Sequence, residues 1–158
     1  MFLVIEAIIK TILFIGLVAV TILTFLQTIF RHIGSISFPG ANELTLLAVV
    51  WVYFIGMAYA TLKDENIQGG MEGVIKSRIL RKALMLFSAF LSAVFSIIAT
   101  YYSLLLVESS ISRGYESIFY SMPDYYWTLS IFVGFFLNSI FFSKKVIFHF
   151  CSYGWRKL

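Results

Sequence analysis

Four long stretches of the chain carry almost only apolar side chains, and polar residues gather between them. At a rise of about 1.5 Å per residue, each stretch is long enough for a helix that crosses the roughly 30 Å hydrocarbon core of a bilayer. The pattern therefore predicts an all-α integral membrane protein, with residues 1–158 as a single membrane domain. We expect its four transmembrane helices at about residues 5–31, 43–63, 82–108 and 125–149.

The composition supports a lipid environment. Of the 158 residues, 60% are hydrophobic and 13% are charged, against about 45–50% and about 25% in an ordinary globular domain. One small core could not hide this much apolar surface from water, so the composition excludes a soluble domain. Cys151 is the single cysteine of the chain, which also excludes a fold held together by internal disulfides.

The basic residues divide unevenly between the two sides that four crossings define. Ten of the twelve Lys and Arg fall near the N-terminus, between the second and third stretches, or after the fourth. Because basic residues accumulate on the cytoplasmic side, both termini are predicted to be cytoplasmic, and the net charge of +4 needs no nucleic-acid partner. The ten are Lys10, Lys63, Lys76, Arg78, Arg81, Lys82, Lys144, Lys145, Arg156 and Lys157, and the other two are Arg31 and Arg113.

The connection between the second and third stretches has a helical pattern of its own. Its apolar residues recur at steps of three or four, while most of its basic residues fall elsewhere. This is typical of a short amphipathic helix lying in the membrane interface, and we expect one at about residues 71–81. The alternative is that the third transmembrane helix simply continues into the cytosol. The apolar residues are Ile67, Met71, Val74, Ile75 and Ile79.

Candidate chemistry is sparse. The apolar runs at 44–62, 83–107 and 125–143 contain no Asp, Glu, Lys, Arg or His, although ion and proton paths through a membrane need such residues. Glu6 is the nearest exception, and because Lys10 follows it by four residues, we expect these two to pair. The sequence predicts no enzyme, no catalytic residue, no metal ligand and no cofactor.

Small and weakly polar residues are ordered along three of the predicted helices. In lipid, helices associate through close approach at small residues and through interhelical hydrogen bonds. We therefore expect these rows to be contact faces, either within the chain or against another membrane protein. The rows are Gly56 and Ala60; Ser88, Ser92, Ser96 and Thr100; and Ser130, Gly134 and Asn138.

A set of short motifs stands in the first half of the chain: Phe30-Arg31-His32, Phe38-Pro39, Glu43-Leu44, Trp51, Phe54-Ile55-Gly56-Met57-Ala58 and Asn66-Ile67. These motifs resemble the first half of the small membrane subunit of TRAP transporters, the tripartite ATP-independent periplasmic family. The chain departs from that family's pattern at His32, Asn42 and Asn66, which leaves side-chain roles at those positions open. Among family members it looks most like the short subunits of sialic-acid systems.

The resemblance implies a non-catalytic subunit in the bacterial inner membrane. Such a subunit pairs with the static scaffold of a large multi-helix membrane subunit, which carries out sodium-coupled uptake of an organic acid such as sialic acid or a dicarboxylate. A periplasmic binding protein delivers the substrate, and membrane lipids surround the complex. For the partner interface we expect Arg31, Glu43 and Trp51 together with Gly56, Ala60, Ser88, Ser92, Ser96 and Thr100.

The residues at the outer helix ends bear on the same interface. Arg31 and Glu43 bracket the first outer connection, and we expect them to pair with each other or with the large subunit. The charges of the second outer connection, such as Glu116, are expected to be mainly solvated. Two other classes stay open: a small proton-coupled multidrug exporter that uses Glu6, and a membrane assembly protein without a transporter partner.

The charge distribution generates the first testable prediction. A reporter that is active only in the periplasm should be active when fused after Ser112 and inactive when fused after Lys82, because the basic asymmetry places these sites on opposite sides. Reporter activity in cells measures this directly, with a cytoplasm-active reporter at the same two positions as the control. The reverse pattern would overturn the predicted orientation.

Overall fold

The computed structural model describes residues 2–33, 39–63, 65, 77–117 and 120–154. The described residues form four long helices, each apolar enough and long enough to cross a membrane. This confirms the predicted all-α architecture with four membrane-spanning helices. The helices are α1 (Phe2–Ile33), α2 (Pro39–Lys63), α4 (Arg78–Arg113) and α5 (Tyr125–Gly154).

Local sequence accounts for several helix ends. Pro39 opens α2, where its missing N–H and its restricted φ suit the first helical turn. The Ser77 hydroxyl accepts a hydrogen bond from the Leu80 N–H at 3.5 Å and caps α4. Gly114 ends α4 in the left-handed conformation at φ 63°, and its N–H bonds to the Ile111 carbonyl at 3.2 Å, as glycine C-caps commonly do.

The predicted interfacial helix at about residues 71–81 falls largely beyond these elements. Residues 71–76 lie outside the described residues. Residues 78–81 form the first turn of α4, so this part of the predicted segment continues directly into the third spanning helix.

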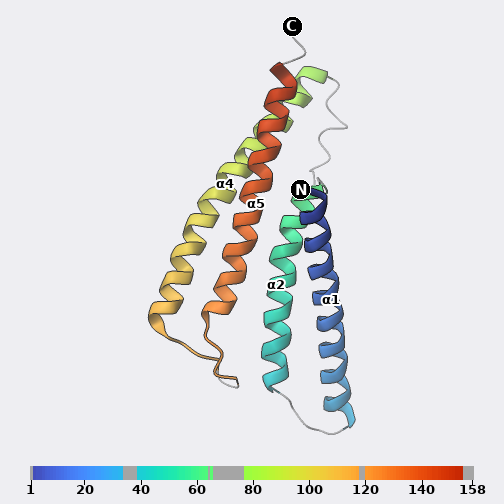
Figure 1. Cartoon of the computed structure of the whole chain (residues 1–158), viewed down its shortest axis with the longest axis vertical. Helices are drawn as coiled ribbons and strands as arrows, with labels where there is room; N and C mark the ends of the chain where they lie inside the picture. The colour runs from blue at the N-terminus through green and yellow to red at the C-terminus, as the bar shows by residue number, and fades with distance from the viewer. Residues whose placement is uncertain (1, 34–38, 64, 66–76, 118–119, 155–158) are drawn as a thin grey trace.

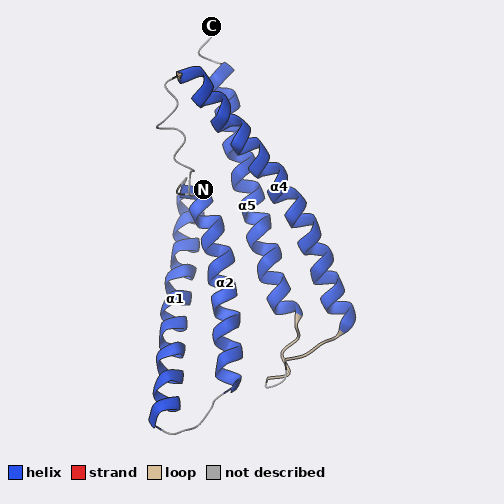
Figure 2. Ribbon diagram, turned by 180° about the vertical axis from the view of Figure 1, so that it is seen from behind, coloured by secondary structure: helices blue, strands red, loops and turns tan. Residues whose placement is uncertain are grey.

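The four helices lie in an open row. α1 packs along α2, α2 along α5, and α5 along α4, so the order across the molecule is α1, α2, α5, α4, as Figures 1 and 2 show from opposite sides. We call the end of the row opposite the C-terminus, where α4 connects to α5, the outer end. The row leaves one long side of both α1 and α4 without a neighbour, and those sides are apolar, with exposed residues such as Phe14, Phe25, Phe87 and Phe95.

A small apolar cluster lies where three helices meet. Ile9 of α1, Ile55 and Ala58 of α2, and Phe141 of α5 are buried together. Half-buried neighbours, Trp51 among them, pack around this cluster. Because α2 lies between α1 and α5, the cluster links α1 to α5 through the second half of α2.

Two glycines set the distances between neighbouring helices. A Cβ at Gly134 of α5 would lie 2.5 Å from the Phe54 Cβ and 3.0 Å from the Phe54 carbonyl oxygen on α2. A Cβ at Gly16 of α1 would lie 2.5 Å from Val52 Cγ2. A Cβ at Gly56, by contrast, would meet only Leu13 Cδ2, at an ordinary 3.8 Å. The close approaches through which helices associate in lipid are therefore at Gly16 and Gly134.

The buried face of α4 follows steps of four and three, instead of the constant step of four that the sequence suggested. Ser88 is exposed and Ser92 and Thr100 are half-buried, so of that row only Ser96 is buried. A constant step of four drifts about 40° around a helix at each step, whereas alternating steps of four and three stay near one face. The buried residues of α4 are Ala89, Ala93, Ser96, Ser103, Val107 and Ser110.

The glycine contacts generate the second prediction. Gly134→Ala should lower the free energy of unfolding of the purified protein by about 2 kcal/mol or prevent its accumulation, because its Cβ is forced against the Phe54 Cβ and carbonyl oxygen on α2. Gly56→Ala is the matched control and should change stability little, since its Cβ finds ordinary contact. Thermal unfolding in mild detergent measures both, and equal stability of the two variants would show that α2 and α5 do not approach closely at Gly134.

Candidate functional site

The outer corner between α1 and α2 is closed by a side-chain amide. Gln27 Nε2 donates to the Ala41 carbonyl oxygen and to Thr45 Oγ1, each at 2.6 Å. Thr45 Oγ1 in turn donates to the Ala41 carbonyl at 2.9 Å. An amide that pairs across two helices in this way is a favourable interhelical contact in lipid. The sequence offered a signal for it, since Gln27 is the only amide side chain in the first apolar stretch.

Glu43 accepts a hydrogen bond from the connection between α4 and α5 and does not form an ion pair with Arg31. The Ser117 hydroxyl, in the connection between α4 and α5, donates to Glu43 Oε2. Both residues are half-buried, whereas Arg31 is exposed. Among the described residues no ion pair joins Arg31 to Glu43, so the expected pairing of these two residues is not found. The exposed Arg31 side chain lies on a surface that another protein can reach.

We call the end of the row opposite the outer end the inner end. There an ion pair joins α1 to α2, and the prediction that Glu6 pairs with Lys10 is wrong. Glu6 pairs with Lys63, not with Lys10 one turn away. The physical reason is that α1 and α2 run antiparallel and side by side, so the last residue of α2 lies beside the first turns of α1. The side chains of Glu6 and Lys63 are 30% and 35% exposed, so solvent screens this pair and it serves mainly to align the two ends.

A buried polar contact crosses the α2–α5 interface. Thr61 Oγ1 and Asn138 Oδ1 lie 2.5 Å apart, and both residues are buried, at 5% and 7% exposure. The sequence placed Asn138 in a contact row but gave no indication of its partner. A hydrogen bond between these side chains satisfies polar groups that would otherwise meet hydrocarbon.

The other residues expected at an interface do not gather on one surface. Trp51 is half-buried and packs against the cluster of Ile9, Ile55, Ala58 and Phe141. Gly56 and Ala60 are half-buried in α2, in the interior of the row. The row from Ser88 to Thr100 lies on α4, at one edge of the molecule. The structure thus divides the expected interface between an outer corner, the middle of α2, and α4.

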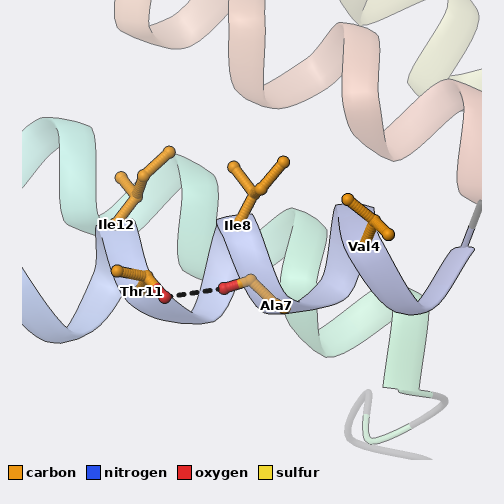
Figure 3. A pocket seen from close by; sticks show the side chains of 5 residues that line it. All are labelled: Val4, Ala7, Ile8, Thr11 and Ile12. Carbon is orange, nitrogen blue, oxygen red and sulfur yellow. Dashed lines mark hydrogen bonds between the residues drawn. The ribbon is translucent and has the colours of Figure 1, made fainter.

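The hollows on α1 are apolar. One, of about 490 Å³, is lined by Val4, Ala7, Ile8, Thr11 and Ile12. Figure 3 shows Val4, Ile8 and Ile12 projecting from α1, while the Thr11 hydroxyl donates to the Ala7 carbonyl at 2.9 Å. The Thr11 hydroxyl donates its proton within its own helix, and the other side chains that line this hollow are apolar. The hollow suits an apolar side chain or a lipid tail.

The polar side chains of the described residues are dispersed along the helices. Among them, no group of three or more His, Cys, Asp or Glu side chains lies close enough to hold a metal ion. Many of the hydroxyls bond to carbonyls of their own helix, as Thr21 does to Leu17 at 2.8 Å and Thr100 to Ser96 at 2.8 Å. What the described structure offers is therefore contact surface, held in shape by a few polar links.

One known protein family matches most of the chain. The family model described as tripartite ATP-independent periplasmic transporters, DctQ component, matches residues 20–151. The chain belongs to this family. The match extends from the middle of α1 into α5, so it confirms the resemblance carried by residues 30–67 and continues it through the second half of the chain. No curated protein sequence matches the chain.

The α2–α5 contact generates the third prediction. Asn138→Ala should destabilise this TRAP transporter component by about 0.6–2 kcal/mol, because it leaves the Thr61 hydroxyl without its partner across the interface. Ser139→Ala is the control, since the Ser139 hydroxyl donates only within its own helix, to the Phe136 carbonyl at 2.9 Å. Thermal unfolding in detergent measures both. Equal stability of the two variants would mean that the Asn138 contact contributes nothing.

Proposed function

We propose that this chain is a non-catalytic subunit that braces a larger TRAP transport subunit in the bacterial inner membrane. The observation that carries the proposal is how little of α1, at one edge of the row, the chain itself covers. In the most apolar part of the α1 span, 6% of the residues are buried within the chain, against 33% in α5. A single row of helices with apolar faces on both edges is suited to lie against a second set of helices and against lipid.

The scarcity of charged side chains within the spanning helices favours a structural role for this chain in the transporter. The described parts of α2, α4 and α5 are uninterrupted helices, whereas transport subunits commonly bind ions and substrate at broken helices and intramembrane charges. Glu6, the carboxylate that a proton-coupled exporter would need, pairs with Lys63 at the helix ends. This pairing favours a structural role for Glu6 over proton coupling.

The finer assignments are part of the same proposal. Sodium-coupled uptake of an organic acid, sialic acid or a dicarboxylate, would be carried out by the large multi-helix subunit, with a periplasmic binding protein delivering the substrate. Both termini of this chain would be cytoplasmic, as the ten basic residues on that side favour. Arg31, exposed at the outer end of α1, is then available to the large subunit or to the binding protein.

The fourth prediction tests the partnership. A large TRAP membrane subunit should co-purify with this chain from native membranes in mild detergent, and Arg31→Ala should lower uptake several-fold while the chain still inserts in the membrane. The expected loss follows from removing an exposed charge at a surface that faces a partner. Uptake in proteoliposomes with the large subunit and the binding protein measures the effect.

Glu116→Ala provides the matched control, because Glu116 is also an exposed outer charge and is expected to be solvated. It should leave uptake nearly unchanged. If no transporter subunit co-purifies, the chain is better described as a membrane assembly protein without a transporter partner. Normal uptake by the Arg31→Ala variant would contradict the proposal that Arg31 contacts a partner.

A further inference from the structure

The connection between α4 and α5 is folded upon itself at the outer end. We call residues 114–117 and 120–124 the outer loop. The Asp124 N–H donates to the Tyr115 carbonyl at 2.9 Å, and the Ser117 N–H donates to the Met122 carbonyl at 2.8 Å. These two hydrogen bonds hold the two arms of the outer loop together. A contact made by Ser117 therefore also restrains the residues that lead into α5.

Two contacts attach the outer loop to the first turns of α2. The first is the hydrogen bond from the Ser117 hydroxyl to Glu43 Oε2. The second is the Tyr120 ring, which lies so close to Gly40 that a Cβ there would be 2.9 Å from Tyr120 Cε2. Gly40 and Glu43 are three residues apart and therefore share one face of α2. The two contacts thus support each other.

These contacts lie near the start of α2, far along the helix from the polar contact between α2 and α5. The row consists of two helical hairpins, α1–α2 and α4–α5, which meet along α2 and α5. The polar link of that interface, between Thr61 and Asn138, lies near the inner end of α2. Glu43 precedes Thr61 by 18 residues, which is about 27 Å along a helix. A link at one end of an interface permits the crossing angle to change, and a second link at the other end opposes that change.

We propose that Glu43 is a positioning residue that clasps the outer loop to α2 and so holds the two hairpins at one angle. Its carboxylate acts through Ser117, and the Tyr120 ring over Gly40 completes the clasp. The hairpins then move as one body, which a brace for a moving partner requires. This last consequence rests on the proposed function, whereas the clasp itself is a property of the chain alone.

The fifth prediction measures the clasp in the full chain. Spin labels are placed at Leu46→Cys on α2 and Tyr115→Cys on the outer loop, two exposed positions, in a protein whose Cys151 is replaced by Ser. Pulsed electron spin resonance in lipid nanodiscs then gives the distribution of distances between the labels. Glu43→Ala should lower the ratio of clasped to unclasped molecules about ten-fold, since a hydrogen bond to a charged acceptor is lost.

The comparison variants separate positioning from general damage. Glu43→Gln keeps an oxygen that accepts from Ser117 and should restore a narrow distribution. Ser117→Ala should broaden the distribution as Glu43→Ala does, and the double variant should be no broader than either. Glu116→Ala, which removes an exposed carboxylate of the outer loop, should match the parent. A distribution in Glu43→Ala as narrow as in Glu116→Ala would overturn the clasp.

Uptake by the assembled transporter tests the consequence. Glu43→Ala should lower uptake several-fold and Glu43→Gln should restore it. In the Glu43→Cys, Ser117→Cys double variant, a short thiol cross-linker should restore uptake that is low without it. Broadened distances with full uptake in Glu43→Ala, or loss of uptake on cross-linking, would overturn the bracing role. Failure of the parent chain to join any transporter would contradict the proposed function and leave the distance measurements to decide the clasp.

Discussion

The close approach of α2 and α5 is the contact on which the rest of the row depends. α1 reaches the other hairpin mainly through α2, and α4 packs mainly on α5, so the α2–α5 interface joins the two halves of the molecule. In lipid no hydrophobic force drives helices together, because the tails are as apolar as the side chains. Contact must come from fit and from polar pairing. Gly134 supplies the fit against Phe54, and Asn138 supplies the pairing with Thr61.

The same constraint explains where the remaining polar side chains go. Gln27 links α1 to α2 at the outer end and Lys63 pairs with Glu6 at the inner end. Glu43 joins α2 to the connection that leads into α5. Each of these links lies at a helix junction, where a polar group would otherwise face hydrocarbon or leave two helix ends unaligned.

An open row is an unusual way to bury apolar surface, and it has a functional consequence. A closed bundle would turn the contact faces of α1 and α4 inward, whereas here both helices keep a long apolar side uncovered, with residues such as Phe14 and Phe95 exposed. Under the proposed function, this geometry would provide area for a larger membrane partner of this TRAP transporter component. A rigid row is more useful for that purpose than a flexible one, because a brace resists motion only if its own parts stay in register.

The sequence by itself determined the four spanning helices and the family, because hydrophobic length and the motif from Phe30 to Ile67 are properties of neighbouring residues. It also indicated that small residues mediate packing, and Gly134 fulfils that role. Only the tertiary structure decided which helices are neighbours. Glu6 therefore pairs with Lys63 and not Lys10, and Glu43 bonds to Ser117 and not Arg31. These partners lie 57 and 74 residues apart in the sequence. Such pairings follow from helix order and tilt, which depend on the sum of many weak contacts across the whole chain and leave no local pattern to be read.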